Sequence, residues 1–202
     1  MNEKIDISEI KKGIKFSIDN AFELIEEAEI LFENKKYART YSLSQLALEE
    51  IGKSVILFDL YHTLQADDRH KIDFKKLNKN FKDHKSKTFE LLIVGLIMKG
   101  KDKIESAEFE KIASKNLKEI QRNKSGYFDK LKNESLYVSY NKKKFEKPSE
   151  LISKEKSSKF LSDVKSKIEF SSEDTLKWLR MDEWLGADKE GILTDLQNDL
   201  NK

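Results

Sequence analysis

Apolar residues recur at three- and four-residue intervals through most of the chain, which is the spacing of amphipathic helices. The first such segment starts at Ser8, a residue suited to cap a helix, and ends at Asn34. A short turn then leads into a second segment, Tyr37 to about Leu64. So short a connection predicts two long antiparallel helices. Further helices are predicted at about 83–100, 106–123, 127–132 and 153–181.

One run, LYVSY at Leu136 to Tyr140, is clearly strand-like. It leads into a lysine-rich loop that ends at Pro148. Because one strand cannot build a sheet alone, we expect it to be a short extended segment lying against the helices. The predicted fold is all-α, a bundle of four to five long helices. Residues 1–150 would form the bundle, and residues 151–202 a helical extension packed on it.

The second predicted helix carries polar residues where burial is expected. Its segment Tyr41 to Leu60 has apolar residues on nearly every side, which is typical of a helix inside a bundle. Four polar residues nevertheless point in one direction from this helix: Arg39, Ser42, Glu50 and Lys53. Burying a carboxylate and an ammonium costs roughly several kcal/mol per ion unless they are paired. One interpretation is therefore a functional site along this stripe.

The alternative is that Glu49 and Glu50 only form surface pairs with Lys53, worth about 0.2–0.5 kcal/mol each. Gly52 bears on this choice, because glycine inside a helix costs about 1 kcal/mol relative to alanine. Such a glycine is usually kept where another element comes close. We therefore expect tight packing at Gly52, and Glu49 with Gly52 is predicted to belong to a structural network.

Composition narrows the classes of function. Of the 202 residues, 38% are charged, well above the usual quarter, as expected for helices with solvated faces. The chain has 39 basic and 37 acidic residues, so its net charge of +2 gives no general argument for nucleic-acid binding. Any basic site must be local. Each of the few arginines is a candidate for forked recognition of carboxylate or phosphate: Arg39, Arg69, Arg122 and Arg180.

Several other classes of site are excluded by the sequence. The absence of cysteine removes disulfides, thiolate catalysis and cysteine-based zinc sites, and suits a reducing cytosol. The first residues lack the apolar run of a signal peptide, and Leu91 to Met98 is too short to span a bilayer. We expect a cytoplasmic protein without a membrane partner. No nucleotide-binding or metalloprotease motif occurs, so no metal and no cofactor are predicted.

The segment FKDHKSK places His84, Lys85 and Lys87 at the start of the third predicted helix. Free N–H groups and the positive end of the dipole favour an anion there, such as an RNA phosphate. An imidazole group could also transfer protons during attack of a 2′-hydroxyl on the adjacent phosphate. The alternative is an ordinary polar helix start with its lysines in solvent.

Two further places could contact a nucleotide. Arg122 and Tyr127 occur together in QRNKSGYF, and Tyr137 lies in the strand-like run. Each side chain could hydrogen-bond to a base or stack on it. The alternative is that the two tyrosines are aromatic residues at the edge of the core.

Three blocks of sequence occur in a fixed order. They are YARTYSLSQLALEEIGKSVIL at Tyr37 to Leu57, FKDHKSK at Phe81 to Lys87, and LKNESLYVSY at Leu131 to Tyr140, followed by Pro148. Together they resemble the EExGK, HKxK and LYV blocks of the AbiV family of bacterial abortive-infection proteins, a branch of the helical HEPN superfamily. The resemblance covers roughly residues 15–150.

The resemblance implies an HEPN-like bundle and a role in phage defence, in which a host protein arrests gene expression on infection by acting on RNA or translation. It further implies a homodimer, a phage-encoded activator protein and an RNA or ribosomal target. Many HEPN proteins are metal-independent ribonucleases with an arginine followed four to six residues later by histidine. This chain lacks that motif: Tyr127 stands at that spacing after Arg122, and His70 follows Arg69 directly.

Two hypotheses follow for the residues at the motif positions. In an enzyme, His84 would be the general acid or base, Lys53 and Lys85 would stabilise phosphate charge, and Glu50 would orient one of these lysines. The candidate RNA or phosphate contacts are Lys85, Lys87, Arg39, Arg122 and Tyr137. In a non-catalytic binding protein, the same helices would grip RNA, the translation machinery or a phage protein. A third alternative assigns partner binding to the lysine-rich loop and the charged last helix.

Overall fold

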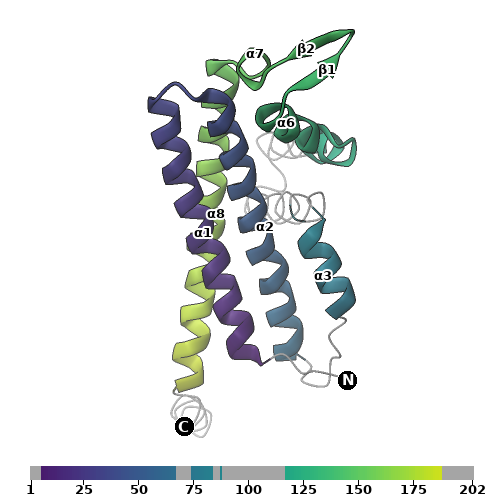
Figure 1. Ribbon diagram of the computed structural model, residues 1–202. Helices are drawn as coiled ribbons and strands as arrows, with labels where there is room; N and C mark the ends of the chain where they lie inside the picture. The colour runs from purple at the N-terminus through teal and green to yellow at the C-terminus, as the bar shows by residue number, and fades with distance from the viewer. Residues whose placement is uncertain (1–5, 67–73, 84–86, 88–116, 188–202) are drawn as a thin grey trace, which may run out of the picture.

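The computed structural model describes residues 6–66, 74–83, 87 and 117–187 (Figure 1). The described helices are α1 (Ile7–Glu33), α2 (Tyr37–Ala66), α3 (Phe74–Lys82), α6 (Tyr127–Leu136), α7 (Pro148–Leu151) and α8 (Lys154–Ala187). Two short strands, β1 (Ser139–Asn141) and β2 (Lys144–Glu146), pair in an antiparallel hairpin. The fold is all-α, as the sequence predicts, and this hairpin accounts for the strands of the described residues.

The first two helices form the antiparallel pair that the short connection predicts. The cap of α1 lies two residues earlier than expected, because the Asp6 carboxylate accepts hydrogen bonds from the N–H and hydroxyl of Ser8, at 3.1 and 2.7 Å. At the other end, the amide of Asn34 donates to the Ile30 carbonyl at 2.8 Å. Lys35 then turns the chain with a positive φ of 60°.

The main core lies between α1, α2 and α8, which run side by side along the molecule (Figure 1). Its buried residues recur at helical spacing on all three helices, and include Ile10, Ile14, Ile18, Ile25, Leu48, Ile51, Val55, Leu161, Val164 and Ile168. A second, smaller cluster joins α2 to α6 and contains Tyr41, whose ring stacks on Phe160 at a centroid distance of 4.3 Å. The predicted boundary at residue 150 stays a prediction, and α8 contributes directly to the main core.

Beside one end of α2 lies α6, and the hairpin projects from it away from the long helices (Figure 1). The extended segment near 136–140 is therefore present, but it does not lie alone against the bundle as expected. Leu136 is the last residue of α6, and Ser139 begins a strand whose partner comes from the lysine-rich loop. A turn of only two residues, Lys142 and Lys143, allows the chain to fold back on itself.

The predicted helices over 83–100 and 106–116 lie outside the described residues. Residues 117–124 are helical, as expected, and lead through Gly126 into α6. Gly126 adopts a positive φ of 76°, a left-handed conformation that glycine tolerates best. None of the described helices is both long and apolar enough to cross a membrane.

Candidate functional site

A line of polar contacts joins α2 to α6 and to the chain at Lys87, and we call it the polar seam. It consists of Arg39, Ser42 and Glu49 on α2, Lys132, Ser135 and Leu136 on α6, and Lys87. Three of the side chains on the helices are almost fully buried, although the residues are polar or charged: Ser42, Glu49 and Ser135. The seam contains residues from each of the three sequence blocks.

Glu49 is the centre of the seam, with only 3% of its side chain exposed. The Lys132 ammonium lies 2.7 Å from one carboxylate oxygen, and the Lys87 ammonium lies 3.0 Å from the other. Both lysine side chains are also buried, at 9% and 5% exposed. Because one carboxylate holds an ammonium from each of two other segments, it fixes their positions relative to α2. Removing one partner of such a buried pair typically costs about 3–5 kcal/mol.

Gly52 lies one helical turn beyond Glu49 and allows the chain at Lys87 to come close. A Cβ added at position 52 would lie 2.7 Å from the carbonyl carbon of Lys87, which is shorter than real Cβ contacts. The tight packing expected at this glycine is confirmed. Its physical role is to let the backbone at Lys87 approach α2, so that the ammonium of Lys87 reaches the Glu49 carboxylate.

The other end of the seam holds the last turn of α6. The hydroxyls of Ser42 and Ser135 share a hydrogen bond of 2.7 Å in the interior. One turn earlier on α2, an Arg39 guanidinium N–H donates to the Leu136 carbonyl at 3.2 Å. Positive charge is favourable at a helix C-terminus, where carbonyl groups lack helical partners. Arg39, a predicted phosphate contact, thus also supports the root of the hairpin.

Glu50 and Lys53 do not form the buried stripe that the sequence pattern predicts. They pair with each other at i,i+3 spacing and are partly open to solvent, at 18% and 25% exposed. The buried carboxylate is Glu49, because α6 and Lys87 pack against its side of the helix. Successive helical residues differ in direction by about 100°, so burial of Glu49 leaves Glu50 at the edge. This pair therefore remains accessible to a ligand.

The FKDHKSK block is only partly described, since His84 and Lys85 lie outside the described residues. Lys87, predicted as a phosphate contact, instead points into the protein and donates to Glu49. The sequence offered a signal for this, because Gly52 predicted that another segment approaches the helix. Nothing in the spacing indicated which segment that would be.

Arg122 and Tyr127 come together at the start of α6. The Arg122 guanidinium lies 5.5 Å from the centre of the Tyr127 ring, within the range of a cation–π contact. Tyr127 is 38% exposed, so the pair faces solvent and could meet a ligand. Nearby, burial raises the pKa of the Tyr41 hydroxyl; Tyr127 raises it further, whereas Arg122 lowers it. The buried Tyr41 ring packs on Phe160 in the smaller core cluster.

Sequence reasoning singled out Tyr137 and the lysine-rich loop but missed the exposed apolar surface around them. Tyr137 and Val138 are each 64% exposed, Tyr140 is 62% exposed and Phe145 is 78% exposed. The signal was available in the aromatic residues on both sides of the lysines. It was missed because the run was interpreted as a single strand, without a partner that would order the aromatic rings.

Two observations concern polar groups outside the seam. Gln45 is 1% exposed, and neither atom of its side-chain amide has a hydrogen-bond partner among the described residues. Within the same residues, no group of three or more histidine or acidic side chains could hold a metal ion. The candidate site consists of the polar seam, whose polar side chains are buried except at Arg39, and two accessible pairs, Glu50–Lys53 and Arg122–Tyr127, with the exposed hairpin beside them.

Comparison with known families agrees with the resemblance of the sequence blocks. The HEPN family model described as AbiV matches residues 9–169, which include most of α1 and all of α2, α6 and the hairpin. No curated protein and no solved structure matches the chain. The family match extends over most of the 202 residues, and the all-α bundle is the fold it implies. The chain belongs to the AbiV family of HEPN proteins.

Proposed function

We propose that this chain is an anti-phage abortive-infection effector that arrests gene expression in an infected cell by acting on RNA or on translation. The observation that carries the proposal is the match to the AbiV family over residues 9–169. We further propose that it works as a homodimer and that a phage-encoded protein triggers it.

Burial divides the candidate residues into two groups with different roles. Glu49 and its two lysine partners are sealed from solvent, which supports a role in holding the helices together. Glu50 and Lys53 keep part of their side chains exposed at the edge of the same helix. An ammonium at such an edge can contact an RNA phosphate, with the carboxylate orienting it. Lys53 is therefore the described residue we assign to phosphate contact, and Glu50 to its orientation.

A second candidate is a metal-independent ribonuclease with His84 as general acid or base and Lys85 as a further phosphate contact. One contact supports this ribonuclease candidate. Lys87, from the same sequence block as His84, packs against Gly52, which is next to Lys53 in the chain. In this candidate, the RNA is cut, whereas in the first it is held or translation is blocked. The two candidates differ in their products rather than in their fold.

The test is a phage-plaque assay with the wild type, Lys53→Ala and His84→Ala, with total RNA and protein synthesis measured in infected cells. Lys12→Ala is the matched control, because Lys12 forms an exposed i,i+3 pair with Glu9 on α1. We expect Lys53→Ala to lose protection and arrest, and Lys12→Ala to keep both. Melting curves must show that each variant is folded.

The RNA pattern separates the candidates. New RNA fragments that disappear in His84→Ala support the ribonuclease, whereas arrest with intact RNA supports the non-catalytic effector. If the wild type gives neither protection nor arrest against any phage tested, the proposed function is overturned. If Lys53→Ala behaves like Lys12→Ala, the role assigned to Lys53 is wrong.

A further inference from the structure

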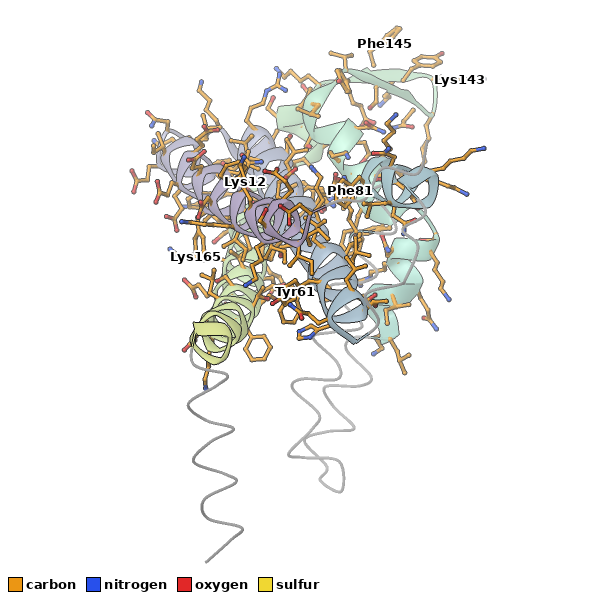
Figure 2. All side chains as sticks on the ribbon, turned by 90° about the horizontal axis from the view of Figure 1, so that it is seen from below. Lys12, Tyr61, Phe81, Lys143, Phe145 and Lys165 are labelled. Atoms are coloured by element: carbon orange, nitrogen blue, oxygen red, sulfur yellow. The ribbon has the colours of Figure 1, made fainter. Side chains whose placement is uncertain are left out.

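The hairpin formed by β1 and β2 carries two aromatic rings side by side on one face. Tyr140 and Phe145 are cross-strand partners, and their ring centres lie 4.8 Å apart. Directly paired residues of two strands project to the same side of the sheet. Figure 2 shows Phe145 and Lys143 at the outer end of the hairpin, away from the long helices. The rings thus form a platform that faces solvent.

The polarity of this hairpin is the reverse of the usual arrangement. Successive side chains of a strand point to opposite faces, and an antiparallel pair normally turns its apolar face inward. Here the opposite face carries Ser139, Asn141 and Glu146, which are partly buried, and the exposed Lys144, while Tyr140 and Phe145 are mostly exposed. Tyr137 and Val138 extend the exposed apolar surface towards α6. Exposed apolar side chains gathered on a short segment in this way indicate a binding site.

The turn of the hairpin has an unusual choice of residues. Lys142 and Lys143 both have positive φ, at 46° and 66°. Two consecutive left-handed residues define the type I′ turn, in which Asn-Gly is strongly preferred because other side chains are strained there. Strained residues of this kind cluster at functional sites. The lysines are therefore present at the tip in spite of the turn, which points to a role for their charges.

Charge and aromatic surface together identify the ligand. Lys142, Lys143 and Lys144 are all exposed at the tip, and Lys147 follows β2 with its ammonium 3.6 Å from a carboxylate oxygen of Glu150. Lysine is depleted at protein interfaces, so a protein partner fits this combination poorly. Aromatic platforms beside lysines are instead the usual construction of single-stranded nucleic-acid sites, where bases stack and cations follow the backbone.

We propose that the hairpin Tyr137 to Lys147 binds single-stranded RNA. Bases stack on the platform of Tyr140 and Phe145, and phosphates lie against the lysines of the turn. This inference rests on the proposed function, because it names RNA as the molecule on which the effector acts. The polar seam fixes the orientation of the hairpin, since Arg39 donates to the carbonyl of the last residue of α6.

The first test changes the turn and measures binding of a fluorescein-labelled single-stranded oligouridine by anisotropy at several salt concentrations. Lys142→Asn with Lys143→Gly introduces the preferred turn residues, so the hairpin should remain folded while two charges are lost. We expect weaker binding, and a slope of log affinity against log salt that is shallower by about 1.4, from about 0.7 per phosphate contact.

The matched control removes two lysines from another turn. Lys35→Gly with Lys36→Asn removes the same charge between α1 and α2, and Lys35 also has a positive φ, of 60°. We expect its affinity and its salt dependence to equal those of the wild type. If both double variants weaken binding equally, the effect is general electrostatics and the proposal is overturned.

The second test removes one ring of the platform. Phe145→Ala should weaken oligouridine binding by about tenfold or more, because stacking on one aromatic side chain is worth that much per base. Phe16→Ala is the control, since Phe16 is an exposed phenylalanine on α1 at 59%. Because both rings face solvent, neither variant should lower the melting temperature appreciably. Equal affinity of the two variants for oligouridine would overturn the proposal that bases stack on Phe145.

The same variants in infected cells separate this inference from the proposed function. If the hairpin variants lose oligouridine binding and arrest together, both stand. If they lose protection but bind oligouridine normally, the hairpin contacts a protein and the inference is overturned. If the wild type arrests gene expression but binds no oligouridine, the inference fails while the proposed function stands.

Discussion

The polar seam and the aromatic hairpin differ in what each hides from water. The seam buries a carboxylate and two ammonium groups between helices, whereas the hairpin exposes two aromatic rings next to it. Burying charge is costly unless every group is paired, and exposing rings leaves apolar surface in water. In the seam, ion pairs within the molecule offset the cost of burying these charges. The two rings of the hairpin contact each other but remain mostly exposed, so we assign their surface to a ligand.

The two regions are joined at the C-terminal end of α6. Lys132, Ser135 and Leu136 contact α2 through the seam, and the next residues lead into β1. Charged residues in the second helix thus determine where the hairpin stands. Changes in the seam should therefore lower the free energy of unfolding, whereas changes in the exposed hairpin should alter binding and leave stability nearly unchanged.

The largest effect is expected from Glu49→Gln, which removes the buried negative charge while keeping the size of the side chain. The two ammonium groups would lose their charged partner, so the free energy of unfolding should fall by about 3–5 kcal/mol. Urea denaturation measures this loss in the free energy of unfolding. Glu50→Gln is the control, because its pair with Lys53 is partly exposed and should be worth about 1 kcal/mol or less. Equal losses of stability in the two variants would show that the buried charge of Glu49 contributes no more than the partly exposed charge of Glu50.

The next largest effect on the free energy of unfolding is expected from Gly52→Ala. Alanine is the better helix former by about 1 kcal/mol, yet its Cβ would overlap the backbone at Lys87, and we expect a net loss of about 1–3 kcal/mol. Gly13→Ala is the control on α1. There the new Cβ would meet only the flexible end of Leu57, at 3.0 Å, so stability should be unchanged or higher. If Gly52→Ala stabilises the protein, the backbone at Lys87 does not lie as close to Gly52 as described.

A smaller effect on the free energy of unfolding is expected for Ser42 and Ser135, at the end of the seam that holds the last turn of α6. Ser42→Ala or Ser135→Ala alone leaves one buried hydroxyl without this partner and should cost about 1–2 kcal/mol. The double variant removes both hydroxyls, and should cost less than the sum of the single changes. A double-mutant cycle by urea denaturation measures this coupling. Additive losses would show that the two hydroxyls do not interact.

The smallest effect is expected for the ion pair of Glu29 and Lys165, which joins α1 to α8 at the surface. The hydrogen bond and the charge of Glu29 raise the pKa of Lys165 above its ordinary value of 10.5. The stabilisation is thus fully present below that value and is lost as the pH rises through the raised pKa. Both side chains are over 40% exposed, at 41% and 45%, so Glu29→Gln should cost at most about 0.5 kcal/mol.

Salt distinguishes this surface pair from the seam. Exposed charges are screened within about 8–10 Å at ordinary ionic strength, whereas buried pairs are screened much less. Thermal melts should therefore show that added salt removes the effect of Glu29→Gln but not that of Glu49→Gln. Equal salt sensitivity of the two variants would mean that water reaches the seam.

Part of the site could be predicted from local sequence alone. Gly52 predicted a close approach because glycine inside a helix has a cost that needs a reason, and the structure supplies the backbone of Lys87. The choice between Glu49 and Glu50 could not be made in the same way. Both residues are acidic neighbours on one helix, and only the positions of α6 and Lys87 decide which carboxylate is covered.

The sequence by itself determined the all-α class, the antiparallel pair of α1 and α2, and the family, because helical periodicity and short motifs are local properties of the chain. Tertiary structure alone decided that Lys87 and Lys132, far apart in sequence, meet at Glu49, and that Tyr140 and Phe145 share an exposed face. The physical reason is that burial and pairing depend on which segments come together. The pattern along one helix or strand does not contain that information.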